Sequence, residues 1–259
     1  MRHRFSANTG FLWRDLPFTE RIARAGAAGF DAVEFHDEAQ SVGEADVRAA
    51  LREAGLPLVC LNTRMGDSAG CAAIPGQETQ ARDDFAAALD TARALGGQAV
   101  HVLAGRVPSV SDTNGTEIER TYAQALREAA RIAEPHGVTV LVEPISAAAM
   151  PGYAVPTLAG AAAILERVAR PNAKLLFDCF HVQRSVGDLV HNARHHMPMI
   201  GHVQIAGGLT RAEPDHGEID YGFVLPELVA AGYRGMFGCE YTPRGAVEAG
   251  LGWWDRFRD

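Results

Sequence analysis

The sequence predicts a single (β/α)8 TIM barrel over residues 1–259, and three observations carry this prediction. Short apolar runs alternate with longer amphipathic stretches along the whole chain. Several amphipathic stretches end in a glycine just before the next apolar run, which is typical of a helix C-terminus. The length also suits one large domain. A doubly wound sheet would usually carry a G-x-G-x-x-G loop after its first strand, and this chain has none.

The apolar runs are the predicted strands. The stretch "VTVLVE" is typical, because it is rich in β-branched residues and ends on a carboxylate. The predicted strands cover residues 4–8, 31–35, 57–62, 99–103, 138–143, 174–178, 200–205 and 235–240.

The amphipathic stretches are the predicted helices. Phe85, Leu89 and Ala92, for example, fall on one helical face, with Asp and Arg on the other. The predicted helices cover residues 18–29, 43–55, 78–97, 116–137, 157–169, 186–196, 221–232 and 245–258. The long loops at 63–77 and 206–220 are candidate active-site loops.

Composition and charge exclude several classes of protein. The formal net charge of −8 disfavours nucleic acid as a partner, because duplex binding depends on Lys and Arg at the phosphates. No apolar run approaches ~20 residues and no secretory signal is recognised, so we expect neither membrane insertion nor export. The cysteines form no C-x-x-C pair, which favours free thiols in the cytoplasm. We expect a small-molecule substrate. The aromatic segment "GWWDRF" fits core packing or a subunit contact, so a homo-oligomer stays open.

Oxygen-bearing side chains end four consecutive predicted strands. They are Glu143, Asp178, Gln204 and Glu240, spaced 35, 26 and 36 residues apart. Each spacing is about one βα unit of roughly 30 residues. Since barrel active sites lie at the carboxyl ends of the strands, these four side chains should meet on one rim.

Three carboxylates packed together repel one another, and a divalent cation resolves the conflict. Oxygen ligands favour Mg²⁺ or Mn²⁺. A lone carboxylate at a strand end is usually a helix cap or an ion-pair partner, but four such residues in succession favour a metal site. A metal would polarise a carbonyl and acidify the adjacent C–H, and a neighbouring carboxylate could move the proton. The sequence therefore predicts a metal-dependent isomerase or epimerase that works by 1,2-proton transfer through an enediolate.

Several motifs together resemble the hydroxypyruvate isomerase family, which belongs to the xylose-isomerase-like barrels. They run nearly end to end and in order: "RFSAN", "GFDAVEF", "AAIPGQE", "LVEPI", "DCFHVQR", "GHVQIA", "RAEPDHGEIDY" and "GCEYTP". The resemblance implies isomerisation of hydroxypyruvate to tartronate semialdehyde. Closely similar proteins isomerise 2-oxo-tetronates, and more distant relatives epimerise ketohexoses at C3.

The resemblance also implies roles for individual residues. The four strand-end residues match the family's metal ligands, and Glu143 and Glu240 also match its proposed proton shuttles. His181 matches a histidine that contacts substrate oxygens. Arg211 matches an arginine in the loop after the seventh strand, where its planar fork suits a substrate carboxylate.

Two further residues are candidate substrate contacts on weaker grounds. Arg64, in the loop "NTRMGD", could reach over the pocket as an anion contact. Glu34 ends the second strand and could line the pocket, although a structural hydrogen-bond role is about as plausible.

The chain departs from its apparent relatives in three loops that would face the substrate. Ser146 and Ala149 replace residues that are often Asn and Asp, "GGL" stands at Gly207 to Leu209, and "HDEA" stands at His36 to Ala39. These departures leave the substrate open, and the native metal is open too. Two alternatives of other classes remain at this stage. One is a phosphodiesterase of the apurinic-endonuclease type, and the other is a non-catalytic metabolite-binding barrel.

Overall fold

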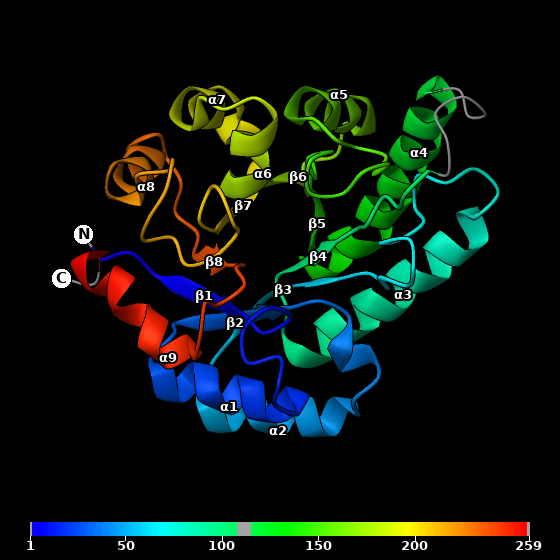
Figure 1. The fold of residues 1–259 in the computed structure, drawn as a ribbon. Helices are drawn as coiled ribbons and strands as arrows, with labels where there is room; N and C mark the ends of the chain where they lie inside the picture. Colours follow the sequence, from blue (N-terminus) through cyan, green and yellow to red (C-terminus); the bar gives the residue numbers. More distant parts are fainter. Residues whose placement is uncertain (1, 108–114, 258–259) are drawn as a thin grey trace.

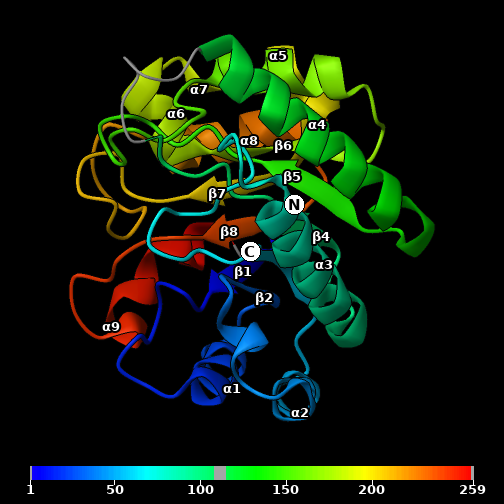
Figure 2. The same cartoon turned by 90° about the vertical axis from the view of Figure 1, so that its right-hand side faces the viewer.

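The strands close into the predicted barrel. The computed structural model describes residues 2–107 and 115–257. Eight parallel strands pair in chain order, and β1 pairs with β8 to close the ring. Figure 1 shows the strands at the centre with the helices around them, and Figure 2 shows the same barrel turned by 90°. The predicted (β/α)8 fold is confirmed.

All eight predicted strands form, and most are slightly shorter than expected. They are β1 (Phe5–Asn8), β2 (Ala32–Phe35), β3 (Leu58–Asn62), β4 (Ala99–His101), β5 (Thr139–Val142), β6 (Ala173–Asp178), β7 (Ile200–Ile205) and β8 (Phe237–Cys239).

The helices lie outside the strands, and none of those in the described ranges is long and apolar enough to cross a membrane. They are α1 (Phe18–Ala28), α2 (Glu44–Ala54), α3 (Glu78–Leu95), α4 (Gly115–Ala133), α5 (Leu158–Val168), α6 (Cys179–Ser185), α7 (Leu189–His196), α8 (Tyr221–Ala230) and α9 (Val247–Gly250).

Two helical regions differ from the prediction. Helix α6 begins directly after β6, where the sequence analysis expected a loop, because the side chain of Asp178 accepts a hydrogen bond from the Phe180 backbone N–H and caps the helix. The predicted C-terminal helix is one turn of α9 followed by a 3-10 helix, Leu251–Phe257. That segment joins the C-terminal region to the N-terminal region, since the His3 backbone N–H donates to the Phe257 carbonyl.

The barrel interior changes from apolar to polar along the strands. Ala99, Leu141 and Leu176 belong to a small buried apolar cluster that is separate from the larger core. Side chains two positions apart in a strand point to the same face. Two residues beyond Leu141 and Leu176, the interior therefore receives Glu143 and Asp178, and the polar site rests on this apolar floor.

Candidate active site

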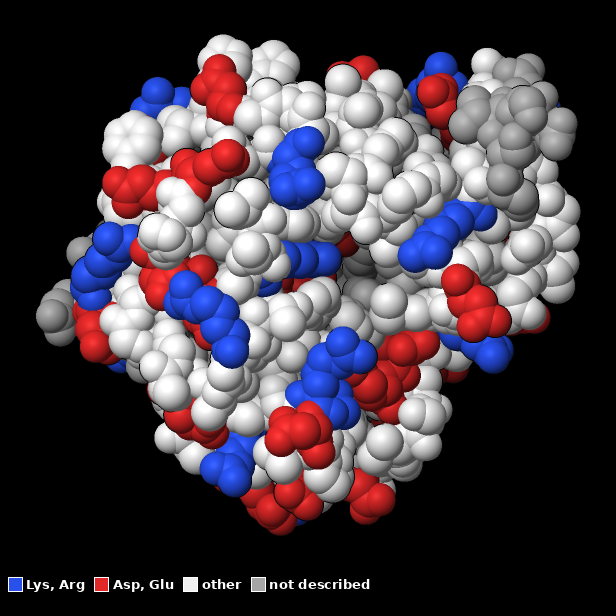
Figure 3. Space-filling view, viewed as in Figure 1, with Lys and Arg blue, Asp and Glu red and all other residues white. Residues whose placement is uncertain are grey.

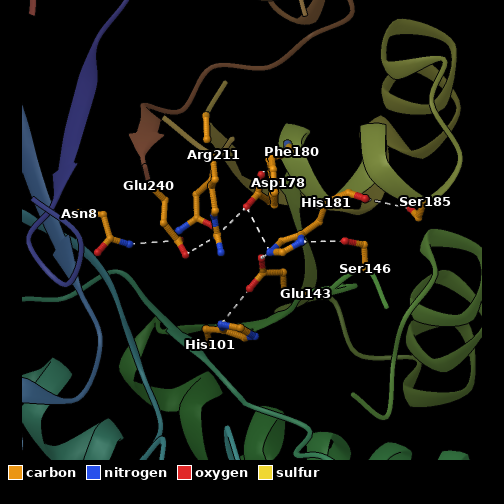
Figure 4. Close-up of polar contacts among 12 residues, drawn as sticks. Asn8, His101, Glu143, Ser146, Asp178, Phe180, His181, Ser185, Arg211 and Glu240 are labelled. Carbon is orange, nitrogen blue, oxygen red and sulfur yellow. Dashed lines mark hydrogen bonds and ion pairs between the residues drawn. The ribbon is translucent and has the colours of Figure 1, made fainter. Parts of the chain in front are cut away.

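The four predicted metal ligands lie at the carboxyl ends of neighbouring strands. Glu143 directly follows β5, Asp178 ends β6, Gln204 lies near the end of β7 and Glu240 directly follows β8. All four side chains are buried. Figure 4 shows Glu143, Asp178 and Glu240 gathered around one region together with His181 and Arg211.

Glu143 faces two histidines. Its Oε2 lies 3.6 Å from His101 Nδ1, and its Oε1 lies 3.5 Å from His181 Nε2. The same His181 nitrogen lies 3.7 Å from Asp178 Oδ2, and the other ring nitrogen lies 3.3 Å from the Ser146 hydroxyl. His181 is therefore inside the site, where the sequence analysis expected it.

Arg211 connects the other two carboxylates. Its Nη2 lies 2.7 Å from Glu240 Oε1 and 3.2 Å from Asp178 Oδ2. The guanidinium also lies over two aromatic rings, 4.7 Å from the centre of Phe11 and 5.2 Å from that of Phe180. The predicted arginine of the loop after β7 thus belongs to the site.

Burial and mutual repulsion disfavour the charged carboxylates. Burial raises the pKa of Glu143 well above its ordinary value, and the charges of Glu240 and Asp178 raise it further. Burial raises the pKa of Glu240 to about 8, although Arg211 opposes the shift. Burial lowers the pKa of His181 to about 4. An added positive charge at the centre of the cluster would favour the charged carboxylates, while the neutral His181 could face such a charge without repulsion.

The donor atoms fit a divalent cation. Among the described residues, Glu143 Oε1 and Gln204 Oε1 are buried oxygens without a hydrogen-bond partner, and both belong to the predicted ligand set. Glu143, Asp178 and His181 each offer one ligand atom, and these atoms lie within 4.8 Å of one another. Buried oxygens without donors are costly unless something else binds them. The residues could therefore hold Mg²⁺ or Mn²⁺.

The two weaker substrate candidates lie elsewhere. Glu34 is fully buried, and its carboxylate accepts from Ser6, Asn8, His202 and Gln204. These bonds favour the structural hydrogen-bond role over the substrate contact, because the oxygens of Glu34 are already bound to protein. Arg64 is exposed in the loop after β3. Within residues 2–107 and 115–257, no hydrogen bond or ion pair joins Arg64 to the four ligands.

Glu34 is nevertheless charged at neutral pH. Burial alone would raise the pKa of its carboxyl group, but the facing His202 and the donated hydrogen bonds outweigh burial, so the pKa lies below its ordinary value.

Sequence analysis missed two polar neighbours of the site. Asn8 donates from Nδ2 to Glu240 Oε2 at 3.1 Å, and His101 faces Glu143. Asn8 ends the predicted strand at 4–8, so the rule that found the ligands could have found it. His101 lies inside the predicted strand at 99–103 and becomes a strand end only because β4 stops at His101.

Charged residues of both signs surround the mouth of the barrel. Figure 3 shows this face in the view of Figure 1, with a hollow near its centre and basic and acidic side chains interspersed around it. Among the described residues on this face, basic side chains alternate with acidic ones and do not form a continuous stripe of the kind that tracks a nucleic-acid backbone.

Comparison with known proteins identifies the family of the chain. The family model described as "Xylose isomerase-like TIM barrel" matches residues 22–257. The chain belongs to this family. A 2-oxo-tetronate isomerase from Cupriavidus necator is 39% identical over 254 residues, which cover 96% of each chain. The hydroxypyruvate isomerase of Escherichia coli K12 is 34% identical over 98% of this chain and 99% of its own.

A solved structure named an AP endonuclease, family 2, from Brucella melitensis is 37% identical, with a TM-score of 0.95 and full coverage of both chains. A putative hydroxypyruvate isomerase from Homo sapiens is 40% identical over 98% of this chain and 96% of its own. The predicted hydroxypyruvate isomerase family is thus confirmed, and so is the prediction that the chain is an isomerase.

Proposed function

We propose that this isomerase is metal-dependent and interconverts a small 2-oxo-3-hydroxy acid with its 2-hydroxy-3-oxo isomer, which is an aldehyde in the case of hydroxypyruvate. Hydroxypyruvate and the 2-oxo-tetronates are the candidate substrates, and full-length relatives named for both support this choice. The observation that supports the proposal is the set of three buried carboxylates and one amide at the carboxyl ends of β5 to β8, in which Glu143 Oε1 and Gln204 Oε1 have no hydrogen-bond partner among the described residues.

The chemistry follows from this donor set. A bound divalent cation would polarise the substrate carbonyl and acidify the neighbouring C–H. In hydroxypyruvate, a carboxylate of the site takes a proton from C3, a proton is returned at C2, and the hydroxyl proton moves from O3 to O2. The ketone thereby becomes an aldehyde. Glu143 and Glu240 are the proposed proton carriers, because both carboxylates lie in the site and burial raises the pKa of each above its ordinary value, which favours uptake of a proton.

Arg211 and His181 are proposed to hold the substrate. Arg211 Nε has no hydrogen-bond partner among the described residues, so an N–H is free for a substrate carboxylate beside the bonds to Glu240 and Asp178. His181 is neutral because its pKa is lowered, and its Nε2 lies between Glu143 and Asp178. It is placed to hydrogen-bond a substrate oxygen without adding charge.

The direct test is exchange of solvent deuterium. The protein is incubated in D2O with Mn²⁺ or Mg²⁺ and with hydroxypyruvate, 2-oxo-tetronates or ketohexoses, and ¹H NMR follows loss of the C3 signal and appearance of product. We expect exchange and isomerisation with at least one of the 2-oxo acids. Exchange into ketohexoses alone would instead favour a ketose 3-epimerase. Bound metal without exchange into any compound would contradict the proposal and favour a non-catalytic barrel.

The phosphodiesterase alternative requires a separate assay, because the solved structure from Brucella melitensis carries an endonuclease name. The net charge of −8 and the oxygen-rich ligand set disfavour this alternative. Cleavage of a duplex containing an abasic site, at moderate salt and with the same metals, would support it.

A further inference from the structure

The buried carboxylate of Glu34 accepts a hydrogen bond from the side-chain amide of Gln204, which is one of the proposed metal ligands. Glu34 Oε1 accepts a hydrogen bond from Gln204 Nε2 at 2.8 Å. Gln204 Oε1, at the other end of the same amide, is buried and has no hydrogen-bond partner among the described residues. The amide nitrogen of Gln204 is therefore bound to Glu34, whereas the amide oxygen is bound to no described residue.

An amide side chain needs such a partner if it is to bind a cation. The oxygen and the NH2 group of glutamine are similar in size, but only the oxygen can bind a metal ion. A carboxylate next to the amide accepts hydrogen bonds and cannot donate one, so it selects the orientation that presents NH2 to Glu34. In that orientation the oxygen of Gln204 points away from Glu34.

The rest of the Glu34 environment keeps the carboxylate in place. Its Oε2 lies 2.6 Å from His202 Nε2 and accepts from the Ser6 hydroxyl at 3.0 Å. Its Oε1, which accepts from Gln204, also accepts a hydrogen bond from Asn8 Nδ2 at 3.3 Å. Four donors thus surround one carboxylate, with the histidine and hydroxyl on one oxygen and the two amides on the other.

The neighbouring strand leaves room for this carboxylate. A Cβ atom built at Gly238 would lie 2.5 Å from Glu34 Oε1 and 2.6 Å from Oε2, closer than Cβ contacts allow. Gly238 is paired with Gln204 in the β7–β8 ladder. The absence of a side chain at that position allows Glu34 to reach the Gln204 amide.

We propose that Glu34 is a positioning residue, which holds Gln204 Nε2 and thereby directs Gln204 Oε1 toward the cation. This inference rests on the metal site of the proposed function. It differs from a purely structural role, in which the Glu34 hydrogen bonds would stabilise the barrel without affecting the cation.

The test is a Mn²⁺ titration of the full chain by calorimetry, which needs no substrate. We expect Glu34→Gln to weaken Mn²⁺ binding by about 10- to 100-fold, the usual effect of losing a residue that orients a metal ligand. Glu213→Gln is the matched control, because it makes the same substitution at another buried glutamate, whose carboxylate binds Arg244 rather than a predicted ligand. Its Mn²⁺ affinity should stay within about threefold of the wild type.

Thermal unfolding checks that each variant is folded, and Glu34→Asp replaces Glu34→Gln if the latter does not fold. Glu34→Asp retracts the carboxylate from Gln204 while keeping its charge.

A double-mutant cycle with Gln204→Ala identifies the route of the effect. If Glu34 acts through the Gln204 amide, adding Glu34→Gln to Gln204→Ala should change Mn²⁺ affinity by less than about threefold. An equal loss in both backgrounds would overturn the inference, and so would wild-type affinity in folded Glu34→Gln. Failure of the wild-type protein to bind Mn²⁺ or Mg²⁺ would instead contradict the metal site of the proposed function, and the role of Glu34 with it.

Discussion

Single residues of the site differ in how firmly they are held. Both oxygens of Glu240 are bonded, Oε1 to Arg211 and Oε2 to Asn8. Glu143 has one oxygen without a hydrogen-bond partner among the described residues, and its nearest polar neighbours are two histidines at 3.5 and 3.6 Å. Glu143 is thus the less constrained carboxylate, which suits a group that both binds a cation and exchanges a proton.

Replacing Glu143 by glutamine should abolish most of the activity. The amide keeps the shape of the side chain but cannot take up a proton, so we expect kcat to fall by about 10²-fold or more. Steady-state isomerisation of the active 2-oxo acid measures this. Glu213→Gln is the control, because Glu213 is another buried glutamate, whose carboxylate binds Arg244 rather than a predicted ligand. Unchanged kcat in Glu143→Gln would exclude Glu143 as a proton carrier.

The sequence was sufficient to predict which strand-end side chains lie at the site, but not the contact between Glu34 and Gln204. A strand that ends in a carboxylate is visible in a sequence, since the strand pattern and the charge are both local. The contact between Glu34 and Gln204 joins residues 170 positions apart, and it depends on the barrel closing β1 against β8 and on the space above Gly238. Nothing local in "DAVEF" distinguishes that role from a substrate contact.

At the scale of elements, the loop after β7 determines where Arg211 lies. Arg211 has a φ of 56°, a left-handed conformation that is uncommon for a residue with a side chain. The Gly207 N–H donates to the Ala212 carbonyl, and the Arg211 N–H donates to the Gly207 carbonyl. These bonds fold the loop back on itself and turn the guanidinium toward Asp178 and Glu240.

Arg211→Lys should weaken substrate binding more than it slows the chemical step. Lysine keeps the charge but loses the planar fork and the stacking over Phe11 and Phe180. We expect KM for the active 2-oxo acid to rise by about 10-fold, the effect of losing a hydrogen bond to a charged group. Measurement of kcat and KM separately checks this, with Arg244→Lys on the surface as the control. A change confined to kcat would contradict a role in binding the substrate carboxylate.

The helix boundaries show a second limit of local patterns. The predicted helix at 186–196 begins late, because α6 precedes it and α7 follows a break at Asp188, whose φ is 47°. Asp178 explains the difference, since one side chain ends β6, caps α6 and faces Arg211. A sequence pattern assigns one role to such a residue, whereas the folded chain gives it three.

At the scale of the whole molecule, the closed barrel concentrates acidic groups of separate strands in its interior. Glu143, Asp178 and Glu240 come from different βα units and are brought together only when strands β5 to β8 pair in the folded chain. Their repulsion therefore belongs to the folded state and opposes it, while a cation at the centre would relieve it. Metal binding should thus be coupled to the stability of the entire domain.

The dependence of this coupling on pH has a definite sign. The pKa of Glu240 is raised from 4.5 to about 8. Between these values the folded, metal-free protein retains a proton that the unfolded chain has released, so its contribution to stability falls as pH rises through this window. We expect the metal-free unfolding midpoint to fall from pH 5 to pH 8, and Mn²⁺ to raise it more at pH 8 than at pH 5. Calorimetric unfolding with EDTA or Mn²⁺ measures both effects. Glu240→Gln has no such proton to lose, so its metal-free midpoint should fall less steeply over the same range. Equal stabilisation by Mn²⁺ at both pH values would contradict a cation held by these carboxylates, because protons would then not compete with it.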